Sequence, residues 1–313
     1  MKNETKNEII AALEAYMQQY SISANEIAKK TGVNSSYISN MRSGKTTIQV
    51  GEKEVEIADK YYETIAKLIN YQLVKNYWPT VPTVQMKRIL ATLEDAKEYG
   101  YTNVIIGETG CGKSYVANLF SQNYPLDCFI ITVSSQDNIG DLLEKICDKI
   151  HIATEKSKSK TLRAVTRKLQ TLKSDGHQPQ IIFDEAEYMR QPALCNMKEL
   201  YDNLNGVCSI ILMGTDQLTR HLEKMRKKNK DGIPQLYRRI KFGIRVLPAI
   251  DKTFKQFLNG DLNSHSILNF VRDNCDNYGE LHDLLVPAMR EAERTGQPLT
   301  ENFIRTIFNM LNL

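Results

Sequence analysis

The sequence predicts an α/β protein in which helices cover both faces of a mostly parallel sheet, with a smaller helical region at each end. Three observations predict this class. Between Val84 and about Pro248, short apolar strands alternate with amphipathic helices, which is the pattern of successive βαβ units. Before residue 77 the apolar residues recur only at helical spacing, and after Pro248 no strand pattern remains.

These patterns divide the chain into three domains and a linker. We expect an all-α domain at 1–76, a linker at 77–83, an α/β core at 84–248 and a helical lid at 249–313. Pro79 and Pro82 oppose helix formation in the linker. The only tryptophan, Trp78, either anchors the linker on the next domain or packs locally, and local packing is the preferred interpretation.

The core has apolar runs of strand length separated by helical patterns. Strands are predicted at 103–107, 128–133, 180–184 and 207–213. Helices are predicted at 84–98, 113–123, 137–151, 159–174, 191–204 and 216–228, and three or four more at 251–312.

Composition narrows the functional class. The 313 residues are 42% hydrophobic and 25% charged, as in an ordinary globular protein, and the longest apolar runs are too short to cross a bilayer. The six cysteines have no paired spacing, and the N-terminus has no signal-like apolar run, so we expect the reduced thiols of a cytoplasmic protein. The net charge is only +4, but residues 220–245 hold ten Lys and Arg against two acidic residues, which favours a polyanionic partner.

A phosphate-binding loop is the most specific motif in the chain. Residues 107–114 read Gly-Glu-Thr-Gly-Cys-Gly-Lys-Ser, between an apolar strand and a helix. Such a loop turns its N–H groups toward a β-phosphate, while Lys113 reaches the β- and γ-phosphates and the Ser114 hydroxyl reaches Mg²⁺. The sequence therefore predicts binding of ATP and Mg²⁺, with nucleotide contacts from Gly107, Glu108, Thr109, Gly110, Cys111, Gly112, Lys113, Ser114 and Tyr115.

Two carboxylates follow a buried strand about 70 residues after the loop. We expect this strand to lie directly beside the loop strand, with Asp184 holding Mg²⁺ and Glu185 polarising the attacking water. The alternative is that the pair only begins a helix. Thr215 ends the next strand and is predicted to orient the water; it also suits the N-cap of the following helix, and both roles can coexist.

Two arginines lie just before the last strand of the core. In Gln-Leu-Tyr-Arg-Arg-Ile, Arg239 is the first candidate and Arg238 the second for an arginine that enters the nucleotide site of a neighbouring subunit. The alternative is a solvated basic surface.

The N-terminal region contains a helix-turn-helix pattern, which resembles the small DNA-reading domains of phage and bacterial regulators. Gly32 can take the positive φ of the turn, Asn34 or Ser35 caps the second helix, and Gly44 ends it. A helical hairpin for protein contacts would show the same pattern. If the domain binds DNA, the outward face presents Ser35, Ser36, Tyr37, Asn40, Arg42 and Lys45.

Taken in order, these motifs resemble the AAA+ ATPases, and more closely the phage Mu B protein family of Mu-like elements. The resemblance implies ATP-dependent assembly on DNA, capture of target DNA and stimulation of a transposase with an RNase H-like core. Many AAA+ proteins place a nucleotide-sensing arginine at the start of a lid helix, where this sequence offers His282, with Arg272 and Arg290 as alternative candidates.

A basic segment of the core is a second candidate for DNA contact. If subunits form a helical ring, Lys158, Lys160 and Arg163 are our candidates for its bore, and solvated surface is the alternative. The basic residues between Lys224 and Lys230 also suit subunit contacts.

The combined prediction is an ATPase that forms a filament or ring on duplex DNA with little sequence preference and presents that DNA to a transposase. A helicase loader or replication-initiation ATPase shares the same motifs. A transcriptional regulator in which ATP switches a sequence-specific helix-turn-helix is the third hypothesis.

Overall fold

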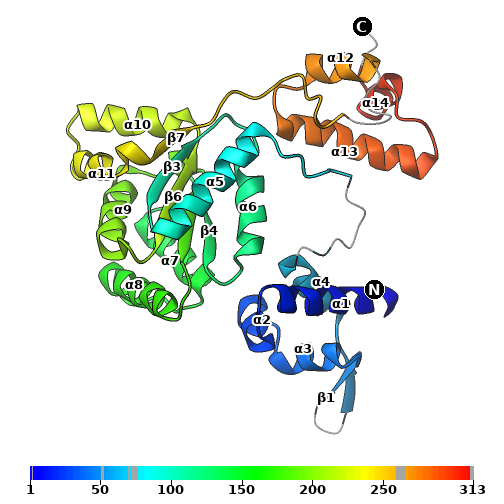
Figure 1. Ribbon diagram of the computed structural model, residues 1–313, viewed down its shortest axis with the longest axis horizontal. Coiled ribbons are helices and arrows are strands. Elements are labelled where there is room, and N and C mark those ends of the chain that lie inside the picture. The colour runs from blue at the N-terminus through cyan, green and yellow to red at the C-terminus, as the bar shows by residue number, and fades with distance from the viewer. Residues whose placement is uncertain (2, 51–52, 70, 72–76, 259–264, 311–313) are drawn as a thin grey trace. The chain divides into compact units, whose positions relative to one another are not determined.

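The structure is a computed structural model that describes residues 1, 3–50, 53–69, 71, 77–258 and 265–310 (Figure 1). The chain forms two compact units, Met1–Asn76 and Tyr77–Leu313.

The first unit contains the helix-turn-helix that its sequence predicts. Helices α1 (Asn3–Gln19), α2 (Ala24–Thr31), α3 (Ser35–Arg42) and α4 (Asp59–Leu68) enclose a small apolar core. Gly32 ends α2 with φ 70°, and the Asn34 side chain accepts a hydrogen bond from the N–H of Ser36 to cap α3. The turn therefore follows from one left-handed glycine and one side-chain cap.

The sequence predicted an all-α domain for residues 1–76, but this unit also contains a β-hairpin. Strands β1 (Thr47–Val50) and β2 (Lys53–Glu56) pair antiparallel, with Ile48 opposite Val55. The segment is rich in β-branched residues at alternate positions, which favours a strand. The helical spacing of the neighbouring segments obscured this period-two pattern.

The second unit is built on a five-stranded parallel sheet. Strands β3 (Thr102–Ile106), β4 (Cys128–Thr132), β5 (Gln180–Asp184), β6 (Ser209–Gly214) and β7 (Ile244–Val246) follow the order β4-β5-β6-β3-β7. The strand carrying Asp184 is therefore not beside the loop strand, because β6 lies between them. The chain between β3 and the β4–β5 pair leaves one strand position empty, and β6 later fills it. The residues of an individual strand do not specify which strand will lie beside it.

Alternate residues of the strands pack on opposite faces of the sheet, as strand geometry requires. Val104, Phe183 and Leu212 pack with α7 (Ile139–Ile150), α8 (Lys158–Ser174), α9 (Gln191–Leu204), α10 (Asp216–Lys227) and α11 (Ile233–Ile240). Ile105 and Ile211 pack with α5 (Val84–Tyr99) and α6 (Lys113–Asn123). Two short 3₁₀ turns, η1 (Ala186–Tyr188) and η2 (Lys241–Gly243), precede α9 and β7. The predicted core strands and helices agree with these elements to within about two residues.

The C-terminal helices are α12 (His265–Asn274), α13 (Tyr278–Thr295) and α14 (Glu301–Ile307), and we refer to this helical segment as the lid (Figure 1). Their buried residues, such as Phe270 and Leu285, belong to the same apolar cluster as α5 and α6. Among the described residues no helix combines the length and apolarity needed to cross a membrane.

Trp78 packs on the lid and not locally, which corrects the preferred interpretation. Its ring stacks on Phe257 with centroids 5.0 Å apart and meets the His282 ring edge-on at 5.2 Å. Both partners lie far along the chain, so periodicity in the linker could not reveal them.

A buried ion pair joins α5 to the amino-terminal edge of the sheet. The Lys97 ammonium, 5% exposed, donates to Asp127 Oδ2 at 2.8 Å and to the carbonyl of Gln178, and it lies over the ring of Tyr124. This cluster is at the edge opposite to the phosphate-binding loop, so its effect on stability can be separated from nucleotide binding.

Replacing Asp127 with Ala would leave the Lys97 charge buried without its carboxylate, and we expect a loss of about 3–5 kcal/mol in the free energy of unfolding. Urea denaturation followed by circular dichroism measures it. As a control, Asp276→Ala removes the carboxylate of the exposed Lys252–Asp276 pair and should leave the midpoint nearly unchanged. If the two substitutions lowered the free energy of unfolding equally, burial of the Lys97 charge would not explain the loss in Asp127→Ala.

Candidate nucleotide site

The phosphate-binding loop follows β3 at the carboxyl edge of the sheet. Gly110 and Gly112 have φ of 72° and 93°, a conformation that glycine adopts readily, and Gly112 begins α6 without a side-chain cap. The first N–H groups of this helix have no intrahelical partner, so they are available to an anion. The Gly107 N–H donates to Gly214 O at 3.1 Å, which ties the loop to the end of β6.

Two side chains of the loop have the chemistry that phosphate binding requires. Lys113 Nζ donates to the carbonyls of Gly107 and Glu108 at 2.8 and 2.9 Å, so its ammonium lies along the loop. Burial raises the pKa of the Cys111 thiol, which keeps it neutral beside an anion. Glu108, Thr109, Ser114 and Tyr115 are exposed.

Asp184 and Glu185 lie at the end of β5, on the same edge. Asp184 is 5% exposed and accepts a hydrogen bond from the N–H of Glu185 at 3.0 Å. Glu185 has φ 58°, a left-handed conformation that is uncommon outside glycine, and its side chain is exposed. The pair does not begin an α-helix directly; the short turn η1 follows it.

Thr215 ends β6 and begins α10, so it lies on the same edge again. It occupies the N-cap position, but its side chain makes no capping hydrogen bond. Its Oγ1 is buried and has no hydrogen-bond partner among the described residues. The hydroxyl is therefore not used by the helix and remains available to a bound ligand or water.

Glu187 is the residue that the sequence analysis missed. Its Oε1 accepts a hydrogen bond from the Thr215 N–H at 3.3 Å, and its Oε2 is buried with no partner in the described part of the chain. The sequence did contain a signal for this residue, because Glu187 is the last carboxylate of the Phe-Asp-Glu-Ala-Glu segment. Only the turn η1 brings the Glu187 side chain to the end of β6.

The lid contacts the loop directly. The N–H of Tyr278 donates to Gly110 O at 3.1 Å, and a Cβ on Gly110 would lie 2.1 Å from Asn277 Oδ1. The Tyr278 hydroxyl donates to the buried amide oxygen of Gln85, whose amide nitrogen donates to Pro248 O and Ala249 O. The start of α5, the core–lid connection and α13 are thus held together around the loop.

A cavity of about 330 Å³ adjoins this contact, between Val84, Gln85, Ala249, Gln256 and Tyr278. Its volume is at the lower end of the range of small-molecule pockets. Nearby, Tyr115, the residue after the loop, shares a hydrogen bond of 2.6 Å with Thr80 of the linker.

Of the three candidates for a lid sensor, His282 lies closest to the loop contact along α13. It is one helical turn after Tyr278, its Nδ1 lies 2.9 Å from Asp283 Oδ1, and its ring contacts Trp78. Arg290 is 12 residues after Tyr278, about 18 Å further along the helix axis. Arg272 pairs with Asp273 on α12.

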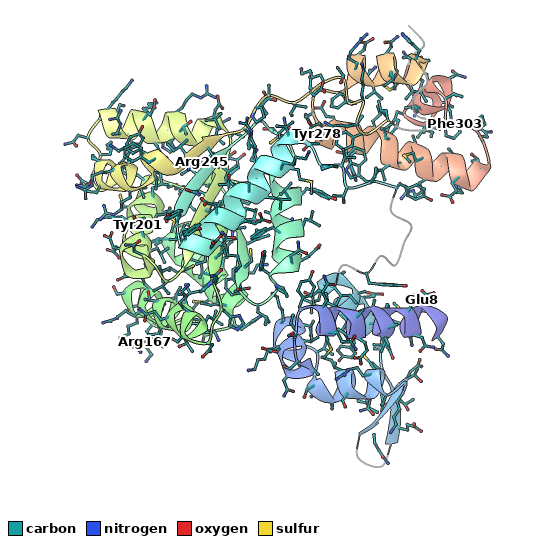
Figure 2. The ribbon with its side chains drawn as sticks, in the orientation of Figure 1. Glu8, Arg167, Tyr201, Arg245, Tyr278 and Phe303 are labelled. Carbon is teal, nitrogen blue, oxygen red and sulfur yellow. The ribbon has the colours of Figure 1, made fainter. Side chains whose placement is uncertain are left out.

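The two arginine candidates lie on α11 and differ in their contacts. In Figure 2 they can be located from the labelled Tyr201 on α9 and Arg245 on β7. Arg239 pairs with Asp202 of α9 at 2.7 Å and lies over the ring of Tyr201. Arg238 is exposed, and within the described part of the chain no ion pair or hydrogen bond holds its side chain. This difference favours Arg238, the second candidate.

The residues predicted to contact DNA are on the surface of their respective units. Ser35, Ser36, Arg42 and Lys45 are exposed, but Arg42 forms an ion pair with Glu14, which raises the pKa of the guanidinium. The Tyr37 ring packs edge-on against Tyr61. Asn40 donates back to Ser36 O. Lys158, Lys160 and Arg163 are exposed on the first turns of α8.

The residues at this edge fit ATP and Mg²⁺. The Ser114 hydroxyl and the Asp184 carboxylate are oxygen ligands of the kind that Mg²⁺ prefers, and Lys113 with the α6 N-terminus complements phosphate charge. The unpartnered Thr215 hydroxyl is an independent sign that this corner accommodates a polar ligand.

Replacing Gly110 with Ala should weaken ATP binding, because a Cβ there adds left-handed strain of about 1–2 kcal/mol and displaces Asn277. Titration with a fluorescent ATP analogue measures the affinity, and Trp78 emission reports the lid. Gly176→Ala is the control, since Gly176 has φ 89° and open space at Cβ. Wild-type affinity in Gly110→Ala would contradict the lid–loop contact.

Comparisons with known proteins agree with this geometry. A family model described as "AAA domain" matches residues 97–222. No match was found among curated protein sequences.

Solved structures share the fold at low identity. The ORC2 protein of Aeropyrum pernix, in ADPNP and ADP complexes, is 18% identical with a TM-score of 0.52, over 76% of this chain and 70% of that one. Cdc6p of Pyrobaculum aerophilum is 15% identical with a TM-score of 0.52, over 74% and 67%. The ORC1 protein of Aeropyrum pernix, in complex with DNA, is 14% identical with a TM-score of 0.52, over 76% and 67%. Residues 97–222 therefore match an AAA domain, and the chain has the AAA+ P-loop NTPase fold.

Proposed function

We propose that this protein is a DNA-stimulated ATPase that assembles on duplex DNA with little sequence preference and delivers that DNA to a transposase. One observation carries the proposal: Lys113, Asp184, Glu185 and Thr215 lie at the ends of three hydrogen-bonded strands, in a chain that also holds a helix-turn-helix unit. The transposase is the partner that the resemblance to the Mu B family implies.

The chemistry follows from the positions of these groups. Lys113 and the loop N–H groups bind the phosphates, and Ser114 with Asp184 would hold Mg²⁺, which neutralises charge on the transferred phosphoryl group. The exposed Glu185 carboxylate polarises the attacking water, and Thr215 orients it. Asp184 accepts the Glu185 N–H, which fixes the backbone from which the general base projects.

Binding of DNA is supported by the charge of two surfaces. Lys158 and Lys160 are in the first turn of α8, which contains no acidic residue. Cations at a helix N-terminus oppose the helix dipole, so they cost stability unless a polyanion neutralises them. In the helix-turn-helix unit, Lys45 is exposed just after α3, and Arg42 at the end of α3 is exposed but paired with Glu14.

Assembly would place Arg238 in the nucleotide site of a neighbouring subunit. Arg238 is exposed at the end of α11, whereas the Asp202 ion pair holds Arg239 against its own subunit. Closure of the site from two subunits would make assembly depend on ATP and release follow hydrolysis.

With ATP and duplex DNA, we expect filaments or rings in electron micrographs. Lys113→Ala should abolish them because phosphate binding is lost. Glu185→Gln should assemble normally and hydrolyse ATP about 10²–10⁴-fold more slowly, since it binds ATP but lacks the base. Absence of assemblies over a wide concentration range would refute the proposal, and normal turnover in Glu185→Gln would refute the base assignment.

Arg238→Ala should lower DNA-stimulated turnover by about 10³-fold, as expected for an arginine supplied by a neighbour. Mixing this variant with Glu185→Gln, itself inactive but with Arg238 intact, should restore part of the activity. Arg239→Ala is the matched control and should retain turnover. If Arg239→Ala is the slow variant instead, the two assignments are exchanged.

Replication initiation is the second candidate function, because the solved structures with the same fold include ORC and Cdc6 proteins. Capture of a replicative helicase, and not a transposase, by the purified protein with ATP and DNA would favour it.

A further inference from the structure

Two oxygen atoms at the carboxyl edge of the sheet are buried without a hydrogen-bond partner among the described residues: Glu187 Oε2 and Thr215 Oγ1. The same two residues share one hydrogen bond, from the Thr215 N–H to Glu187 Oε1. An unpaired buried oxygen costs free energy, so we expect a bound ligand, ion or water to satisfy such an atom.

Gly214 makes this contact possible. A Cβ at position 214 would lie 2.5 Å from Glu187 Oε2 and 3.4 Å from Glu187 N, so the carboxylate occupies the space of the missing side chain. The Gly214 carbonyl accepts the Gly107 N–H on the other side. The end of β6 is thus held between the phosphate-binding loop and the carboxylate of η1.

The hydrogen bond also leaves the threonine hydroxyl unused. Thr215 is the N-cap of α10 but makes no side-chain cap, while Glu187 binds its N–H and brings a carboxylate to the positive end of the helix. Glu187 therefore fixes the backbone at Thr215, and the position of this backbone determines where the Thr215 Oγ1 can point.

We propose that Glu187 is a positioning residue for ATP hydrolysis, which fixes the Gly214–Thr215 backbone and thereby holds the Thr215 hydroxyl toward the attacking water. This inference rests on the proposed role of Thr215. In this role Glu187 acts through Thr215, and its hydrogen bond links the turn after β5 to the end of β6.

The test measures steady-state ATP hydrolysis and, separately, the affinity for a non-hydrolysable ATP analogue. Glu187→Ala should lower kcat by about tenfold through loss of one buried hydrogen bond, with analogue affinity within about twofold of wild type. Glu187→Gln should recover most of kcat, because its amide oxygen can still accept the Thr215 N–H. Glu223→Ala, which removes an exposed carboxylate of α10, is the matched control and should behave as wild type.

Coupling to Thr215 separates positioning from a general structural effect. The double variant Glu187→Ala, Thr215→Ala should be no slower than Thr215→Ala alone, because Glu187 acts only through Thr215. Multiplicative losses, wild-type kcat in Glu187→Ala, or a Gln variant as slow as the Ala variant would overturn the inference.

If Glu187→Ala does not fold, Gly214→Ala tests the same contact, since its added Cβ displaces the carboxylate while both polar groups remain. It should show the same loss of kcat with analogue affinity retained, and unchanged kcat would overturn the inference. A wild-type protein that binds the analogue but does not hydrolyse ATP would instead refute the proposed function.

Discussion

The hydrogen-bonded register of β3, β6 and β5 is the constraint on which the rest of the site depends. Ile106 pairs with Gly214, and Phe183 pairs with Leu212, so three parallel strands end at one edge. Because strands in register end together, the phosphate-binding loop, the Asp184–Glu185 pair and Thr215 meet at this edge. The bond from the Gly107 N–H to Gly214 O extends this register one residue into the loop.

The lid is held on this edge by backbone and glycine geometry more than by charge. Tyr278 bonds the Gly110 carbonyl, and Asn277 occupies the space that a side chain at position 110 would need. The buried Gln85 amide satisfies Tyr278 and two carbonyls of the core–lid connection at once. The phosphate-binding loop and α13 are therefore joined by contacts that have little room to relax.

The linker takes part in the same arrangement. The Trp78 ring contacts Phe257 and His282, and Thr80 shares a hydrogen bond with Tyr115, so residues at the start of the second unit contact both the lid and the first turn of α6. The ring of His282, the sequence-based candidate for a nucleotide sensor, meets the Trp78 ring edge-on.

The sequence by itself determined the local features of this protein: the phosphate-binding loop, the strand before Asp184, the helix-turn-helix with Gly32 and Asn34, and nearly every core element. These depend on short spacings, on positive φ at glycine and on alternating burial, which are written in neighbouring residues. Only the tertiary structure decided that β6 lies between β3 and β5, that Trp78 packs on the lid, that Asp202 holds Arg239, and that Glu187 binds the end of β6. Each of these is a contact between segments distant in the chain, and the order of strands and the partner of a side chain depend on packing that no local pattern specifies.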